Sequence, residues 1–140
     1  MRNIFQLFLL FPFLSIGQTI YNSQVLYDAF GGLYEPTILR ELFIDFQDPN
    51  YHNVLINSFY TNPSYRIPAT VTLDGVMLDS VGVRYKGNST FVVPNDNGNP
   101  KVPYNLDFNY WVSGQKLMDY NKVKLANSWT DPTFVKEYLA

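Results

Sequence analysis

The sequence predicts an α+β fold in which a mostly antiparallel sheet packs with one or two helices. An Asp74-Gly75 pair between two apolar runs is typical of a two-residue β-hairpin. Helical spacing of apolar residues predicts a helix over residues 51–60. Strands are predicted where apolar and polar residues alternate or apolar runs end at turn residues. They cover residues 42–46, 67–73, 76–86, 101–110 and 123–125.

Composition indicates a folded domain and narrows its chemistry. The chain has 140 residues, of which 46% are hydrophobic and 16% charged, enough apolar material for a core. The formal net charge is −2 and no basic patch is present, which argues against nucleic acid as a partner. The absence of cysteine excludes disulfides and thiolate metal sites. A single histidine, His52, cannot form a multi-histidine metal site, and we predict for it a place on a helix surface or at a helix cap.

The N-terminus has the three parts of a secretory signal peptide, predicted over residues 1–17. Arg2 supplies the positive charge, residues 4–16 are almost wholly apolar, and Ser15 and Gly17 stand at positions −3 and −1 of a cut before Gln18. A buried helix or a membrane anchor is the alternative. We therefore expect a secreted, extracellular or cell-surface protein without a membrane segment after cleavage. Residues 18–35 are predicted to form a linker or leading arm.

Turn and cap residues indicate how the remaining segments are divided. Asp48 is a candidate N-cap for the first helix, and residues 94–100 have the composition of a polar loop. Asp131-Pro132 predicts the start of a second helix that runs to Ala140 without a stop signal. The sequence thus predicts a fragment truncated at its C-terminus, with a further domain expected in the full-length chain.

The segment 82–89 carries the clearest candidate chemistry. Gly82, Arg84 and Lys86 alternate along a predicted strand, so their side chains should share one face. Two neighbouring cations on one face would be stabilised by a bound anion such as phosphate. Residues 87–90 add backbone N–H groups and two hydroxyls. A solvent-facing strand with protective charges explains the same pattern, and Asn88-Ser89-Thr90 also matches a glycosylation acceptor.

The order and spacing of five segments across residues 36–140 resemble the spore-coat protein H (CotH) kinase family, in its N-terminal portion. One of them is Asp79-Ser80-Val81-Gly82-Val83-Arg84-Tyr85-Lys86-Gly87-Asn88-Ser89. The others are residues 67–76, residues 103–108 followed by 114–117, residues 123–127, and the run that starts with Asp131-Pro132-Thr133-Phe134.

This resemblance implies an incomplete protein-kinase-like N-lobe that binds ATP with magnesium or another divalent cation, for phosphoryl transfer to Ser or Thr of a protein substrate. In a kinase small lobe a strand lysine holds the ATP phosphates and a helix glutamate orients it. Lys86 and Glu137 are the candidates for these catalytic roles. The residues implied in cofactor binding are Arg84, Lys86, Gly87, Asn88, Ser89 and Lys101. Metal-binding aspartates are expected downstream, so we predict no metal site in this chain and no activity from it alone.

Two other functions remain open at the level of sequence. A catalytically inactive, kinase-like binding module on the cell surface or spore coat would share the resemblance and lack the downstream aspartates. A carbohydrate-binding or adhesion β-domain would suit the aromatic content of 17%. An exposed row of aromatic side chains would favour this last function.

Overall fold

The computed structural model describes residues 30–129 of a chain that divides into two units, Met1–Glu35 and Pro36–Ala140. In the first unit, Glu35 N–H donates to the Gly32 carbonyl at 3.2 Å, and its carboxylate accepts from Gly31 N–H at 2.5 Å. Residues 30–35 therefore form a closed turn. The predicted signal peptide and residues 18–29 of the predicted linker lie outside the described residues, as does the predicted helix that contains Glu137.

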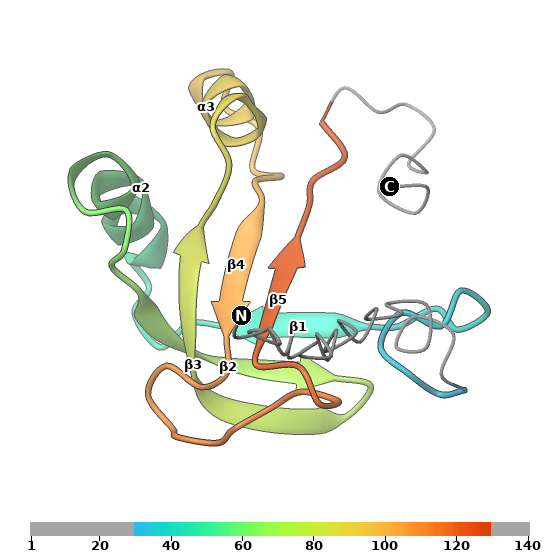
Figure 1. The fold of residues 1–140 in the computed structure, drawn as a ribbon. Helices are drawn as coiled ribbons and strands as arrows, with labels where there is room; N and C mark the ends of the chain where they lie inside the picture. The colour runs from blue at the N-terminus through green and yellow to red at the C-terminus, as the bar shows by residue number, and fades with distance from the viewer. Residues whose placement is uncertain (1–29, 130–140) are drawn as a thin grey trace, which may run out of the picture. The chain divides into compact units, whose positions relative to one another are not determined.

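The described part of the second unit has an α+β fold, as the sequence predicts: a five-stranded antiparallel sheet of order β1-β2-β3-β4-β5 with two helices (Figure 1). Every strand pairs with its neighbour in the sequence, so the sheet needs no crossover connection. The elements are β1 (Leu42–Asp45), α2 (Tyr51–Thr61), β2 (Ile67–Leu73), β3 (Val76–Tyr85), α3 (Ser89–Asp96), β4 (Tyr104–Asp107) and β5 (Lys122–Leu125).

The sheet curls into half of a barrel because β3 is long enough to belong to two differently oriented pairs of strands. Its residues 76–83 pair with β2, and its residues 82–85 pair with β4. In Figure 1, β1 and β2 lie across the view, whereas β4 and β5 lie nearly upright in it, β4 running down and β5 up. The twist of β3 joins these two orientations.

A β-bulge at Asp79–Ser80 keeps the apolar residues of β3 on one face of the sheet. Thr70 of β2 stands opposite both residues, where the register shifts, and its hydroxyl donates to the Asp79 carboxylate at 2.9 Å. Ser80 has a φ of 55°, the left-handed conformation found in many bulges. Because of the extra residue, Val81 follows Leu78 on the buried face instead of turning outward.

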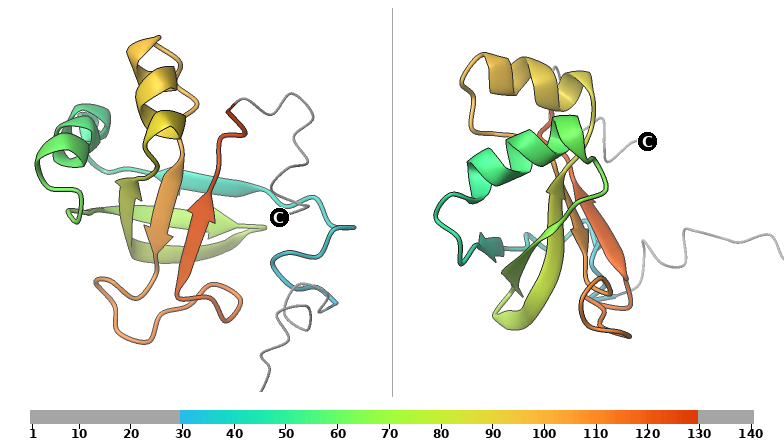
Figure 2. Two further views of the ribbon diagram at one scale, coloured as in Figure 1. Left: turned by 45° about the horizontal axis from the view of Figure 1, so that its top comes forward. Right: turned by 90° about the vertical axis from the view of Figure 1, so that its left-hand side faces the viewer.

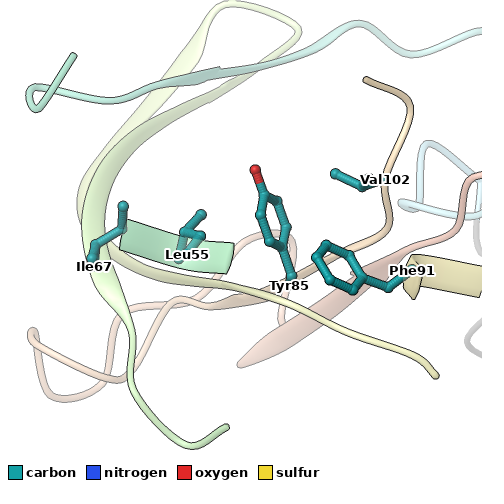
Figure 3. Close-up of a cluster of buried hydrophobic side chains, with 5 residues drawn as sticks. All are labelled: Leu55, Ile67, Tyr85, Phe91 and Val102. Carbon is teal, nitrogen blue, oxygen red and sulfur yellow. The ribbon is translucent and has the colours of Figure 1, made fainter. Parts of the chain in front are cut away.

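The buried face of the sheet packs against both helices. One cluster unites Leu55 of α2, Ile67 of β2, Tyr85 of β3, Phe91 of α3 and Val102, each at most 7% exposed (Figure 3). The helices touch each other where the rings of Phe59 and Phe91 lie 4.1 Å apart. Full burial of a side chain such as Leu or Phe contributes about 1.5–3 kcal/mol. This cluster therefore fixes α2 and α3 against the end of β3.

The hydroxyl group of Tyr85 has a hydrogen-bond partner although its ring lies in this apolar cluster. Its hydroxyl lies 2.6 Å from Nδ1 of His52, near the start of α2. Burial raises the pKa of Tyr85, and the neighbouring Tyr104 raises it further. His52 is exposed as predicted, but it binds the sheet through this contact and does not cap its helix.

Three sequence predictions about local structure are wrong. The N-cap position of α2 is Asn50 rather than Asp48, whose carbonyl accepts from Tyr51 N–H at 3.1 Å. Residues 94–96, which were predicted to be loop, form the last turn of α3. The helix forms despite its polar composition because Phe91 and Pro94 are buried in the core. The strand predicted over residues 101–110 is shorter, because the chain turns after Asp107.

None of the helices within residues 30–129 has the length and apolar character needed to cross a membrane.

Asp74 ties the β2–β3 hairpin to the segment before β1. Its carboxylate accepts from Glu41 N–H at 2.9 Å and from the Arg40 guanidinium at 2.5 Å, while its own N–H donates to the Glu41 carbonyl at 3.0 Å. The hydrogen bond from Glu41 N–H, followed by that from Arg40, lowers the pKa of Asp74. A lowered pKa in the folded state means that the ionised carboxylate stabilises the fold.

We predict that Asp74→Asn flattens the acid side of the stability profile. The contribution of Asp74 is complete above its unfolded pKa of about 3.9 and is lost as the pH falls through the lower folded pKa. The difference in Tm between the original protein and Asp74→Asn should therefore be largest near neutral pH and shrink below about pH 4. Thermal unfolding followed by circular dichroism from pH 7 to pH 2.5 measures it. A difference that is constant with pH would contradict this role.

Candidate functional site

Five of the seven sequence-predicted site residues gather at one end of the sheet, which we call the α3 end: Lys86, Gly87, Asn88, Ser89 and Lys101. Here β3 finishes and leads through Lys86 and Gly87 into α3. Because the strands are antiparallel, β4 begins and β5 finishes at this same end. Figure 2 shows α3 beyond the ends of β3 and β4. The chain topology thus brings residues near positions 86, 101 and 127 together.

Lys86 is held at this end by its own backbone. The preceding Tyr85 is anchored in the core at 2% exposure, and Lys86 N–H donates to the Pro103 carbonyl at 3.1 Å. The lysine side chain is half-buried, and within residues 30–129 no carboxylate forms an ion pair with it. Lys86 is therefore a positioned cation with no acidic partner in the described part of the chain.

The turn between Lys86 and α3 depends on glycine. Gly87 has a φ of 85°, which other residues rarely adopt, and a Cβ atom built on it would lie 2.1 Å from the Thr90 hydroxyl. The turn allows Asn88 to stand at the N-cap position, where its carbonyl accepts from Phe91 N–H and Val92 N–H. Asn88, Ser89 and Thr90 are exposed, so the positive end of the α3 dipole faces outward beside Lys86.

Lys101 joins this group through its backbone. The Lys101 carbonyl accepts from the side chain of Asn127 at 3.0 Å, and the same amide nitrogen donates to the Thr90 carbonyl at 2.8 Å. The segment containing Lys101 thus lies against the first turn of α3. The structure brings together Lys86, Gly87, Asn88, Ser89 and Lys101 at the α3 end.

Arg84 is engaged elsewhere, on the outer face of the sheet, which lies opposite the face that packs against the helices. Its guanidinium donates to the Pro63 carbonyl, and its Nε is buried without a hydrogen-bond partner among residues 30–129. Burial lowers the pKa of Arg66, and the positive charge of the nearby Arg84 lowers it further. The sequence places Arg84 correctly opposite Val83 and Tyr85, but its contacts join it to Arg66 and Pro63 rather than to α3.

A buried ionic network on this outer face was not foreseen from the sequence. The Arg66 guanidinium is buried, donates to Asn105 at 3.2 Å and lies 3.6 Å from the Asp107 carboxylate. Lys122 completes the network at 3.1 Å from the same carboxylate. The ring of Tyr110 covers Arg66 at 5.4 Å and lies so close to Gly82 that a Cβ there would be 2.7 Å from it. These residues are far apart in the sequence, so only the register of β3, β4 and β5 reveals the network.

The loop between β4 and β5 presents aromatic side chains to solvent. Tyr110 and Trp111 are 46% and 53% exposed, with rings 4.8 Å apart and nearly perpendicular. The loop is fixed by the hydrogen bond from Gly114 N–H to Asn109 at 2.5 Å and by that from Gln115 to the Asp79 carbonyl at 3.0 Å. An exposed tryptophan on an ordered loop is a feature of many binding surfaces.

Two parts of the implied kinase site, the partner glutamate of Lys86 and the metal ligands, are not among the side chains described above. Glu137, the candidate partner of Lys86, lies outside the described residues. Within residues 30–129, no group of three or more His, Cys, Asp or Glu side chains is placed to hold a metal ion. The chemistry available at the α3 end is therefore cationic, suited to an anion such as a phosphate.

Comparison with known protein families, with curated proteins and with solved structures gives no match to this chain.

We predict that Gly87→Ala destabilises the protein by about 1 kcal/mol more than Gly98→Ala. Both glycines have a positive φ, so both substitutions carry the left-handed backbone cost of roughly 1–2 kcal/mol. The space around a Cβ at Gly98 is open, whereas a Cβ at Gly87 meets the Thr90 hydroxyl. The additional cost is that of displacing Thr90 from its rotamer, about 0.5–1.5 kcal/mol.

Urea unfolding of the two variants measures this difference. Adding Thr90→Ala, which removes the hydroxyl, should recover the additional loss in Gly87→Ala and leave Gly98→Ala unaffected. Equal destabilisation of the two glycine variants would show that Thr90 does not constrain the turn.

Proposed function

We propose that the chain forms the phosphate-binding part of an exported, CotH-like protein kinase, in which the α3 end holds the phosphates of ATP. The observation that carries this proposal is the meeting of Lys86, the N-terminus of α3 and the Lys101 segment at one end of a curled antiparallel sheet. A phosphate chain placed there would meet positive charge from Lys86 and Lys101 and the positive end of a helix dipole.

The position of Lys86 supports the kinase interpretation over a general anion site. It directly follows the third strand of the sheet and is held by the adjacent strand segment at Pro103. Protein kinases place their phosphate-binding lysine on a strand of a small antiparallel sheet. β5 also ends at this end, at Leu125, and Glu137 follows it by twelve positions in the sequence. Glu137 is our candidate to orient Lys86 in the full-length protein.

Arg84 plays a smaller part in this proposal than the sequence implied. Its guanidinium already binds the Pro63 carbonyl on the outer face. We therefore assign phosphate contacts to Lys86, the residues 87–89 and Lys101, with divalent metal bound through ligands further along the chain. The acceptor would be Ser or Thr of a protein substrate.

We predict that Lys86→Ala weakens the binding of ATP with magnesium to the full-length protein by about 10- to 100-fold, since a charge-assisted hydrogen bond contributes about 1.5–3 kcal/mol. Isothermal titration calorimetry measures the affinity, and transfer of labelled phosphate to a protein acceptor measures the activity. Both should fall together.

The matched control is Lys116→Ala, which removes an exposed lysine from the loop between β4 and β5, at the end of the sheet opposite to the α3 end. It should retain the affinity for ATP within about twofold, because an exposed charge away from the site is screened by solvent. If the two lysine variants bind ATP equally well, Lys86 is not part of a nucleotide site.

A second candidate function, a surface-binding or carbohydrate-binding module, is favoured by the exposed Trp111. Its ring is half exposed on a loop fixed by hydrogen bonds and is flanked by uncharged polar residues, Asn109, Ser113 and Gln115. Aromatic faces next to amide and hydroxyl groups suit the apolar faces and hydroxyls of sugars.

We predict for this second function that Trp111→Ala removes retention of the protein by polysaccharide in affinity gel electrophoresis. Tyr60→Ala is the control, because Tyr60 is similarly exposed at 56% but lies on α2. Equal retention of the two variants, or no retention of the original protein by any polysaccharide tested, would rule out this use of the loop.

A further inference from the structure

Asn127 connects three separate segments through a single buried side chain. It is 5% exposed, and its Nδ2 donates to the Thr90 carbonyl at 2.8 Å and to the Lys101 carbonyl at 3.0 Å. Its Oδ1 accepts from Trp129 N–H at 3.3 Å. A carboxamide has two N–H donors, and here both are used on carbonyls that come from different parts of the chain.

These contacts act on the residues that carry the candidate site. Thr90 lies in the first turn of α3, and Lys101 lies on the segment whose Pro103 carbonyl binds Lys86 N–H at 3.1 Å. The segment 101–103 is thus held on one side by Lys86 and on the other by Asn127. The separation between the two lysines and the start of α3 depends on both attachments.

We propose that Asn127 is the positioning residue of the anion site at the α3 end, where it fixes the spacing of Lys86, Lys101 and the α3 N-terminus around a polyphosphate. This inference rests on the proposed function in so far as the anion is the phosphate chain of a nucleotide. Asn127 does not touch the anion. It acts through the carbonyls of Thr90 and Lys101, so its loss changes the site without removing a charge from it.

The positioning role of Asn127 can be distinguished from a role in the local turn, because the two depend on different atoms of its side chain. The bond to Trp129 N–H spans two residues and needs only an oxygen, so aspartate at position 127 would retain it. The bonds to Thr90 and Lys101 need two N–H donors, which an ionised aspartate lacks. Asn127→Asp therefore keeps the turn and places an oxygen against both distant carbonyls. When its carboxyl is protonated, one donor returns.

The experiment compares the full-length protein with Asn127→Asp, using inorganic tripolyphosphate and ATP with magnesium as the ligands. At pH 8 we expect Asn127→Asp to bind both about tenfold more weakly than the original protein. Burial and the two carbonyl oxygens should raise the pKa of an aspartate at position 127 above its ordinary value of about 3.9, so the ratio of the two dissociation constants should fall toward one as the pH falls to 5 and protonation restores one donor. Because the ionised carboxylate also repels the anion, the pattern of amide exchange measured without ligand decides whether the lost donors act through the spacing of the site. Asn57→Asp, which adds the same charge on the exposed surface of α2, should show a ratio near one throughout.

Amide hydrogen exchange gives a readout that does not depend on ligand. In Asn127→Asp, the amides of Lys86 and Phe91 should exchange at least fivefold faster, whereas amides of the β1–β2 pair should be unchanged. Unchanged exchange at Lys86 and Phe91, or an affinity ratio that does not vary with pH, would overturn the inference. If the original protein binds neither ligand, the proposed function fails, and a faster exchange at these two amides would then support the spacing role of Asn127 alone. Should Asn127→Asp not fold, Asn127→Ser, which retains one donor, decides by the same exchange pattern.

Discussion

The alternation of side chains along β3 is the constraint on which the rest of the structure depends. This strand pairs with β2 along most of its length and with β4 at its end, so an error in its alternation would displace both halves of the sheet. A strand that shifts by one residue moves its whole apolar set to the other face. The bulge at Asp79–Ser80 supplies the additional residue that keeps Val81, Val83 and Tyr85 buried. The burial of Tyr85 in turn fixes where Lys86 leaves the sheet.

The outer face of the sheet and the α3 end differ in how their positive charges are compensated. On the outer face, the Arg66 guanidinium is desolvated and is compensated by Asp107 and by the carbonyls of Gly82 and Asn105. A buried charge without such partners would be strongly destabilising. At the α3 end, Lys86 has no carboxylate among residues 30–129 to compensate it, and the positive end of a helix lies beside it. An anion would supply there the compensation that Asp107 provides to Arg66.

The sequence predicted the α+β fold class and the approximate bounds of β1, β2, β3, β5 and α2, because apolar alternation and the Asp74-Gly75 turn are local signals. It missed α3, since polar residues around Pro94 resemble a loop and the core contact of Phe91 cannot be read from the sequence alone. It named Lys86, the following residues 87–89 and Lys101 as site candidates, and the structure brings them together. It could not foresee Asn127, because the two carbonyls that this residue binds are 26 and 37 positions away in the sequence.

The sequence by itself determined the elements whose signals are local, namely the period of each strand, the hairpin turn and the separation of Lys86 from the apolar residues around it. Tertiary structure alone decided which of the two cations near the end of β3 stays available. Arg84 was drawn to the Pro63 carbonyl on the outer face, while Lys86 was left beside α3 without a carboxylate among the described residues. The reason is physical: the hydrogen-bond partners of these residues are set by distances between segments, and those distances exist only once β3 has paired with β2 on one side and with β4 on the other.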